Sequence, residues 1–135
     1  MNLTNRLRIG DCAEYSKPIT EADIITFAEV TGDNNPVHLD EHYASATIFK
    51  GRIAHGMLVA SMISAVIGTI LPGNGTIYLS QLLEFIKPVR IGDTIKAEVS
   101  VVDILPKGRV KLKTVCYNQF SEIVVDGEAF VMVPS

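Results

Sequence analysis

The sequence predicts an α+β protein in which a single antiparallel sheet of about five strands wraps around one long apolar helix. Two observations carry this prediction. The segment 55–71 is apolar on nearly every helical face, so other parts of the protein must surround it. From residue 76 onward, the apolar residues change from a helical period to a period of two, which is typical of half-buried strands. A length of 135 residues predicts one domain, which we place at residues 1–135.

The N-terminal part supplies a short strand and a helix before the long apolar segment. The strand is expected over 12–18. Thr20, followed three residues later by Asp23, is typical of a capping pair that opens a helix, which we place near 20–31. Gly32 is suited to end this helix, because glycine readily adopts the left-handed conformation common after a helix.

Four further strands are expected after the apolar helix. They are placed at 77–86, 94–105, 109–117 and 123–133. The segments 106–108 and 118–121 are rich in turn-forming residues. Because such tight reversals join neighbouring antiparallel strands, we expect the four strands to follow one another as a meander.

Charge and hydropathy exclude two classes of partner. The chain has 12 Lys and Arg against 15 Asp and Glu, a net charge of −3, and no Trp, so it lacks the basic footprint of nucleic-acid-binding proteins. The apolar stretch 57–71 is shorter than a bilayer-spanning helix, so no membrane insertion is expected. Cys12 and Cys116 have no paired spacing and the N-terminus has no apolar leader core, so we expect a cytoplasmic protein.

The segment 32–40, GDNNPVHLD, is expected to be a loop that carries two reactive side chains. Proline disfavours α geometry in the residue before it, so regular helix cannot cross Asn35–Pro36, and a short helix follows over 41–48. Asp33 and His38 lie five positions apart, and a carboxylate with an imidazole can hold a water molecule and move protons near neutral pH. The alternative is that Asp33 caps a turn and His38 is a buried histidine with satisfied hydrogen bonds.

Gly56, at the start of the apolar helix, offers another reactive group. The first backbone N–H groups of a helix have no intrahelical acceptor and carry partial positive charge, which suits a developing oxyanion. A glycine there lets a substrate approach them. The alternative is that Gly56 only permits close packing against the sheet. His55 is expected to cap the helix or support the site.

A metal site is not expected. His38, Asp40 and His42 alternate, but they straddle a change from loop to helix, and zinc requires three or four convergent ligands. The sequence also lacks the motifs of serine hydrolases, P-loop NTPases and dinucleotide-binding proteins.

Three stretches read together resemble a known family. Phe27–Ala28 precedes TGDNNPVH at Thr31–His38, and IAHGML follows at Ile53–Leu58. The segment 85–93, FIKPVRIGD, agrees with the same pattern. They are similar to the MaoC-like, (R)-specific enoyl-CoA hydratases, which have the hot-dog fold. The resemblance covers nearly the whole chain.

The resemblance implies a homodimer and assigns roles to several residues. Asp33 and His38 would form the catalytic dyad, and the Gly56 N–H would receive the thioester oxygen. The residues implied to bind substrate or to support the dyad are Asn35, His55, Met57 and Ser64, of which Ser64 stands where the family has a serine near the dyad.

The reaction implied is the reversible hydration of a trans-2-enoyl-CoA to an (R)-3-hydroxyacyl-CoA. Water attacks C3 while the dyad takes its proton, and protonation at C2 completes the addition. Conjugation with the thioester supplies the electrophile, so no cofactor is expected beyond the coenzyme A of the substrate. A negatively charged protein must offer the CoA phosphates a local cationic patch. The candidates are Lys87, Arg90, Arg109 and Lys111.

Three other functions fit the same sequence. They are an acyl-CoA thioesterase, an (R)-3-hydroxyacyl carrier-protein dehydratase, and a noncatalytic acyl-CoA binding or dimerisation module. Fold alone does not separate them, because function lies in the site. Thioesterases of this fold do not need the Asn-Pro-x-His loop, and the presence of both Asp33 and His38 disfavours a noncatalytic module.

Overall fold

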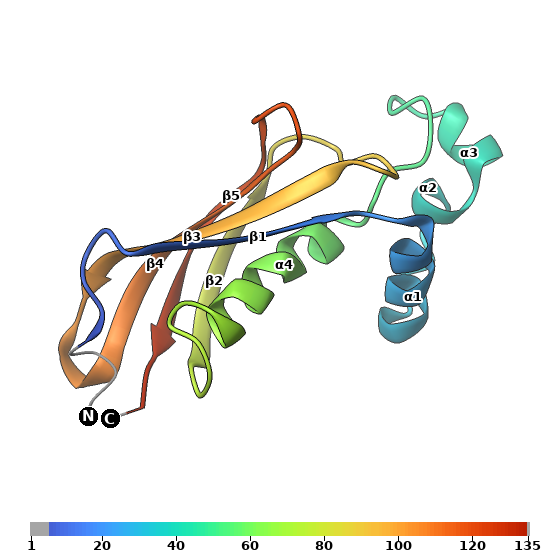
Figure 1. Ribbon diagram of the computed structural model, residues 1–135. Helices are drawn as coiled ribbons and strands as arrows, with labels where there is room; N and C mark the ends of the chain where they lie inside the picture. The colour runs from blue at the N-terminus through green and yellow to red at the C-terminus, as the bar shows by residue number, and fades with distance from the viewer. Residues whose placement is uncertain (1–5, 135) are drawn as a thin grey trace.

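The computed structural model describes residues 6–134, in which one long helix packs against a single sheet (Figure 1). The strands are β1 (Cys12–Pro18), β2 (Ile77–Phe85), β3 (Thr94–Ile104), β4 (Arg109–Tyr117) and β5 (Ile123–Met132). The helices are α1 (Glu21–Thr31), α2 (Pro36–Leu39), α3 (Glu41–Ser45) and α4 (Gly56–Thr69). The predicted α+β class with a five-stranded antiparallel sheet is confirmed.

The predicted capping pair opens α1. The Asp23 N–H donates to Thr20 Oγ1 at 3.1 Å, and the Thr20 N–H donates back to the Asp23 carboxylate at 3.0 Å. Gly32 ends the helix in the left-handed conformation with φ 80°. Both ends of α1 are therefore fixed by local sequence, and the loop that follows starts in a defined direction.

The sheet order is β1-β3-β4-β5-β2, so the predicted meander of four strands is wrong for β2. β3, β4 and β5 do follow one another, but β2 pairs with β5 at the edge. The segment 86–93 then crosses the start of α4, where the Ala54 N–H donates to Val89 O at 2.7 Å. Burial explains the order, because β3 buries alternate residues against the core whereas β2 is exposed along most of its length.

The core lies between α4 and the sheet face that it covers. Alternate residues of β3 point into it and are fully or almost fully buried, as the period of two predicts. They are Ile95, Ala97, Val99 and Val101. From α4, residues such as Val59, Ile63 and Val66 meet them.

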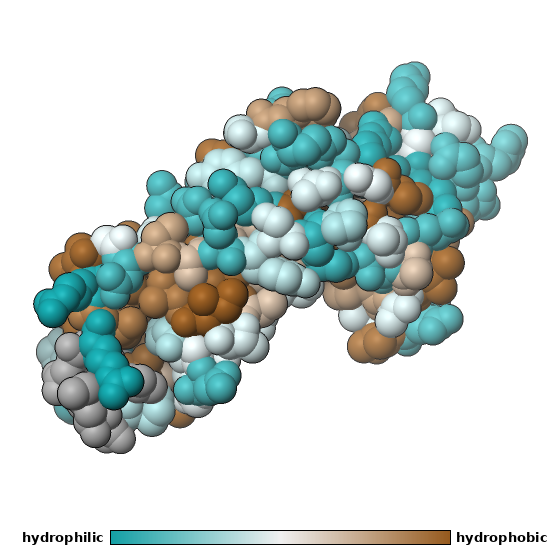
Figure 2. Space-filling view, viewed as in Figure 1, coloured by the Kyte–Doolittle hydropathy of each residue, from teal (hydrophilic) through white to brown (hydrophobic). Residues whose placement is uncertain are grey.

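One face of α4 is not covered by the described residues, so within them the sheet covers the helix only in part. Met57 is 56% exposed and Ile70 is 49% exposed, and Ser61 and Ser64 on the same helix are exposed too. Figure 2 shows apolar surface near the end of α4 and the start of β2, bordered by small pale residues. No helix among residues 6–134 is both long and apolar enough to cross a membrane.

A substitution at Gly127 of β5 tests how closely β2 approaches this strand. An added Cβ at Gly127 would lie 2.0 Å from the backbone oxygen of Leu82, which cannot move without breaking the strand pairing. We expect Gly127→Ala to lower the free energy of unfolding by at least about 2 kcal/mol, as overpacking does in cores. Urea unfolding measures this change.

Gly51→Ala is the matched control, because the nearest atom to its added Cβ is a Glu41 carboxylate oxygen at 3.3 Å on a flexible side chain. It should change the free energy of unfolding by less than about 1 kcal/mol. Equal unfolding curves for the two variants would contradict the strand pairing described.

Candidate active site

Asp33 lies in the loop after α1, whose conformation is held by short-range hydrogen bonds. The Asp33 N–H donates to Thr31 Oγ1 at 3.1 Å. One carboxylate oxygen of Asp33 accepts the Asn35 N–H at 3.3 Å. The side chain is exposed, so the carboxylate keeps access to water while one of its oxygens is held by the backbone.

The second half of the predicted loop 32–40 is helical, so that prediction is wrong there. Pro36 occupies the first turn of α2, where its missing N–H costs nothing. Asn35 remains non-helical, as the sequence predicts, and its Oδ1 accepts the Val37 N–H at 3.2 Å. Asn35 thus caps the helix that carries His38.

His38 is held by two hydrogen bonds from outside its own helix. Its Nδ1 lies 2.8 Å from Ile53 O, and because a carbonyl only accepts, Nδ1 carries the proton and Nε2 keeps a free lone pair. The Arg52 Nε–H donates to His38 O at 2.7 Å. Burial lowers the pKa of His38 below its ordinary value of 6.5, which favours a neutral imidazole able to accept a proton.

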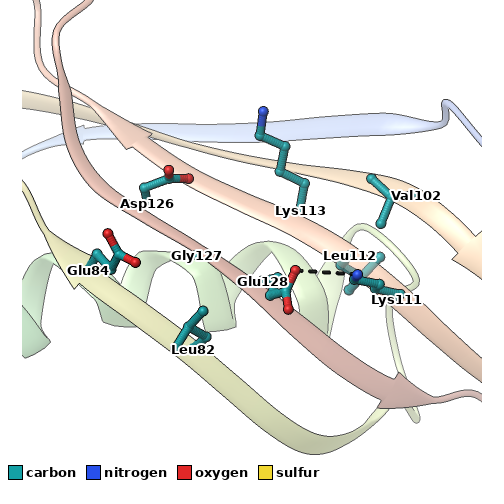
Figure 3. A pocket seen from close by; sticks show the side chains of 9 residues that line it. All are labelled: Leu82, Glu84, Val102, Lys111, Leu112, Lys113, Asp126, Gly127 and Glu128. Atoms are coloured by element: carbon teal, nitrogen blue, oxygen red, sulfur yellow. Dashed lines mark ion pairs between the residues drawn. The ribbon is translucent and has the colours of Figure 1, made fainter.

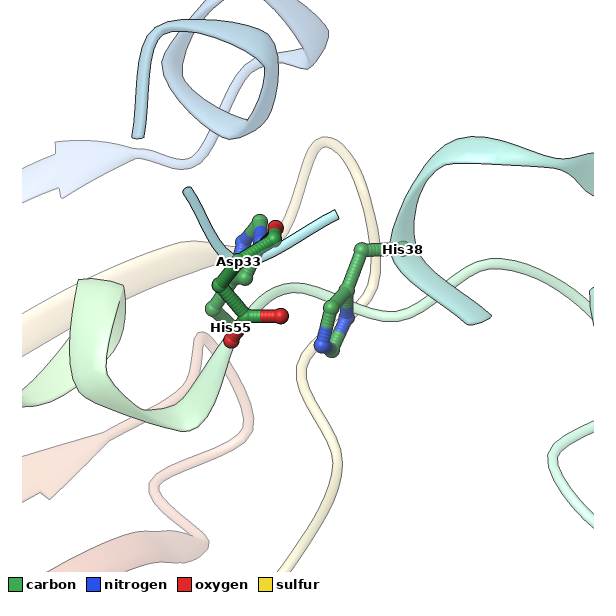
Figure 4. A group of neighbouring side chains, drawn as sticks. All are labelled: Asp33, His38 and His55. Carbon is green, nitrogen blue, oxygen red and sulfur yellow. Dashed lines mark hydrogen bonds between the residues drawn. The ribbon is translucent and has the colours of Figure 1, made fainter. Parts of the chain in front are cut away.

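His55 joins Asp33 and His38 in one cluster. Side-chain nitrogen or oxygen atoms of the three residues all lie within 4.8 Å of one another, and Figure 4 shows the Asp33 carboxylate and the two rings side by side. His55 Nε2 lies 3.1 Å from Asp33 O, and the rings of His38 and His55 stack with centroids 3.9 Å apart. The predicted proximity of Asp33 and His38 is therefore present in the structure.

Gly56 begins α4 directly after His55, so its N–H has no acceptor within the helix. A Cβ at this position would lie 2.7 Å from two ring carbons of Phe85. The absence of a side chain is thus explained by close packing against β2, which was one of the two alternatives for this glycine. That explanation leaves the N–H available to a substrate.

These groups border one cavity of about 420 Å³. Its polar part contains Asp33, His38 and His55 beside the start of α4, and Lys87 lies on its wall. The remaining walls are mostly apolar and come from three segments of the chain that are far apart in sequence, 49–59, 85–89 and 124–125. They include Phe49, Ile53, Met57, Val59, Phe85, Ile86, Val89, Val124 and Val125. A small polar centre inside an apolar cavity suits a substrate with one reactive group and a hydrocarbon tail.

Ser64 is the site residue that the structure places elsewhere. It lies about two turns into α4 on the uncovered face and does not border the cavity, so its predicted place near the dyad is wrong within this chain. Met57 does border the cavity and is largely exposed at its mouth.

Among the four cationic candidates, only Lys87 borders the cavity, where it forms an ion pair with Glu122. Arg90 is half-buried and donates to the backbone oxygens of Gly51 and Phe49, so it holds the segment before α4. Two of its N–H donors are therefore engaged within the chain, and its contact with phosphate stays a prediction.

Arg109 and Lys111 do not border the cavity. Arg109 is at the opposite end of β4 from the cavity. Lys111 pairs with Glu128 at 3.4 Å in a hollow on the sheet face away from α4, which lies behind the strands in Figure 3. Their positive charge is visible in sequence, but the period of two places both on the outer face.

The metal set weighed from sequence does not converge in the structure. Asp40 caps α3 by accepting the Tyr43 N–H at 3.1 Å, and His42 is exposed on that helix. Asp33, His38 and His55 place ligand-type atoms within 4.8 Å of one another, and the two rings pack with centroids 3.9 Å apart and planes tilted by 32°.

Two contributors to the site carry no obvious signal in the sequence. Phe85 belongs to a stretch that resembles the family, but its close approach to Gly56 follows from the edge position of β2. Arg52 links His38 O to Glu21 of α1, at 2.7 and 2.8 Å. Contacts between segments this far apart become predictable only once the strand order is known.

Known proteins that are similar to this chain are described as hydratases and dehydratases. An (R)-specific enoyl-CoA hydratase of Rhodospirillum rubrum is 49% identical over 130 residues, which cover 96% of this chain and 90% of that protein. A mitochondrial 3-hydroxyacyl-[acyl-carrier-protein] dehydratase of Solanum lycopersicum is 38% identical over 135 residues, covering 98% of this chain and 81% of the relative.

A solved structure and a family description give the same result. The R-hydratase PhaJ1 of Pseudomonas aeruginosa, in its unliganded form, superposes with a TM-score of 0.94 at 52% identity, covering 99% of this chain and 87% of that one. This neighbour confirms the predicted hot-dog fold. Residues 10–123 match the family described as MaoC like domain. The chain therefore belongs to the MaoC-like dehydratase family, as the two sequence motifs indicate.

Proposed function

We propose that this protein is an (R)-specific enoyl-CoA hydratase that adds water reversibly to a trans-2-enoyl-CoA. The observation that carries the proposal is the position of Asp33, His38 and the start of α4 at Gly56 on one largely apolar cavity of about 420 Å³. The two hydratase relatives support the same chemistry. The reaction needs a base, a water molecule and a charge acceptor for the thioester oxygen, and each has a candidate here.

The mechanism assigns each group one step. Water held between Asp33 and His38 loses a proton to His38 Nε2 as its oxygen bonds to C3. The electron pair of the C2–C3 double bond moves toward the thioester oxygen, which accepts the Gly56 N–H. The dyad then returns a proton to C2, so that H and OH of one water molecule are added and the (R)-3-hydroxyacyl thioester is formed. No metal or redox cofactor takes part in this scheme.

A carrier-protein dehydratase is the second candidate, and the relative from Solanum lycopersicum favours it. The two activities share the same bond changes and differ in the carrier of the acyl group. Side-by-side kinetics with one enoyl group on CoA and on acyl carrier protein separate them. A preference for the carrier protein of tenfold or more in kcat/KM would select the second candidate.

We further propose that two copies of the chain form a homodimer through β2 and the uncovered face of α4. β2 is at the edge of the sheet, and its exposed apolar residues include Tyr78, Leu79 and Leu82. An unpaired apolar edge of this kind is usually covered in a native protein. Pairing two β2 edges would also bring the exposed faces of α4 together.

Lys87 is our candidate for contact with the CoA phosphates, because it is the cationic residue among the four that borders the cavity. Its ion pair with Glu122 is exposed to solvent and therefore weak enough to exchange for a phosphate. For location we propose the cytoplasm, since Cys12 and Cys116 are both free thiols.

Removal of either dyad side chain should abolish most of the hydration activity. We expect Asp33→Asn and His38→Gln each to lower kcat on crotonyl-CoA by at least about a hundredfold, the scale of a general acid–base group. Loss of the enoyl absorbance without release of free thiol measures hydration and excludes thioester hydrolysis. His42→Gln on the exposed face of α3 is the control and should behave as the parent. Parent-like turnover in both folded dyad variants would refute the mechanism.

The pH dependence of the reaction should report the lowered pKa of His38. Burial favours the neutral imidazole, so protonation and loss of the base occur only as the pH falls below the ordinary value of 6.5. We expect kcat/KM to decrease as the pH falls, with its half-maximal point below 6.5. A half-maximal point at or above 6.5 would contradict this assignment, and NMR titration of the His38 ring provides an independent measurement.

The role of the Gly56 N–H can be separated from the packing role of glycine. In a Phe85→Ala background the contact that excludes a side chain is removed, so Gly56→Ala should be tolerated there. Gly56→Pro in the same background suits the first turn of a helix but lacks the N–H. We expect the proline variant to have about a hundredfold lower kcat than the alanine variant, as for loss of one oxyanion donor. Equal kcat values would assign Gly56 to packing alone.

A further inference from the structure

His55 contacts both members of the dyad, although the mechanism gives it no chemical step. Its Nε2 lies 3.1 Å from the backbone oxygen of Asp33, and since a carbonyl only accepts, Nε2 must donate the proton in this bond. Its ring stacks on that of His38 with centroids 3.9 Å apart and an angle of 32° between the planes. One side chain therefore touches the loop that carries the carboxylate and the ring that carries the base.

The fold alone gives no reason for a histidine at this position. His55 is the residue before α4, yet its side chain makes no capping hydrogen bond to the helix. It is 1% exposed, and its Nδ1 is the one fully buried side-chain nitrogen or oxygen atom among residues 6–134 that has no hydrogen-bond partner. A buried polar atom without a partner destabilises the folded state.

A phenylalanine could pack at this position without burying an unpaired nitrogen. Two aromatic rings already pack against His55. The ring centroid of Phe27 lies 4.8 Å from that of His55, and the His38 centroid lies 3.9 Å from it. Phenylalanine has no unpaired nitrogen and fills a similar space. What it lacks is the N–H that His55 directs at Asp33 O.

We infer that His55 is a positioning residue, whose hydrogen bond to the Asp33 carbonyl and stacking on His38 hold the dyad in its reactive geometry. This inference rests on the proposed function, because it gives His55 an effect only through Asp33 and His38. The bond fixes the loop at the residue that bears the carboxylate. The stacked ring restricts rotation of the His38 imidazole, whose Nδ1 is already fixed by Ile53 O.

The inference predicts that activity and stability change in different directions. We expect His55→Phe to lower kcat on crotonyl-CoA by tenfold or more, to change KM by less than threefold, and to leave the melting temperature equal or higher. His55→Gln keeps an N–H donor near Asp33 O and should keep more of the activity than His55→Phe. A purely structural histidine would give lower activity together with a lower melting temperature.

Double variants separate positioning from a general defect. In an Asp33→Asn background the part of the effect that acts through the carboxylate is already absent, so adding His55→Phe should lower kcat by a smaller factor there than in the parent. His42→Phe on the surface of α3 is the matched control and should equal the parent in both properties. An equal loss from His55→Phe with and without Asp33, or more activity in His55→Phe than in His55→Gln, would overturn the inference.

The same series distinguishes failure of this inference from failure of the proposed function. Full activity in Asp33→Asn and His38→Gln would remove the dyad itself. Inactive dyad variants together with a fully active His55→Phe would leave the hydratase mechanism in place and overturn only the positioning role.

Discussion

The site depends on one buried hydrogen bond, from His38 Nδ1 to the backbone oxygen of Ile53. It joins α2, a helix of only 4 residues, to the segment that leads into α4. A helix this short is not stable in isolation, so its orientation must come from tertiary contacts. The bond also selects the tautomer, because the proton on Nδ1 leaves the lone pair on Nε2. One contact therefore determines the place of the imidazole and its ability to act as a base.

The order of the strands in the sheet supplies the cavity walls that α2 and α4 do not. Because β2 lies beyond β5, the segment 86–93 must return across the start of α4 to reach β3. This path brings Val89 to the cavity, which Phe85 at the end of β2 also borders. Among residues 6–134 the same order leaves β2 unpaired along one edge and α4 open on one face, so the features that build the cavity also leave exposed the surface through which we propose that two copies pair.

Local sequence predicts much of this structure, and long-range pairing limits the rest. The capping pair at Thr20 and Asp23, the left-handed Gly32 and the alternation of β3 were predictable because each depends on neighbouring residues. The proximity of Asp33 and His38 was predictable from their spacing of five positions, whereas the orientation of the His38 ring depends on its tertiary bond to Ile53 O. The edge position of β2, the engagement of Arg90 and the outward position of Ser64 depend on contacts between distant segments, which periodicity does not encode.

The two members of the dyad differ in their surroundings, and that difference suits their proposed roles. His38 is 8% exposed, and removal from water lowers its pKa, whereas Asp33 lies in an exposed loop. The negative charge of Asp33 opposes part of this effect, since it favours the protonated ring. An imidazolium formed during water attack is therefore stabilised by a carboxylate that is already present, while burial keeps the resting ring neutral. Moving Asp33 outward would weaken the first effect and leave the second, so the distance between the two groups contributes to how readily His38 accepts a proton, after burial and the bond to Ile53 O.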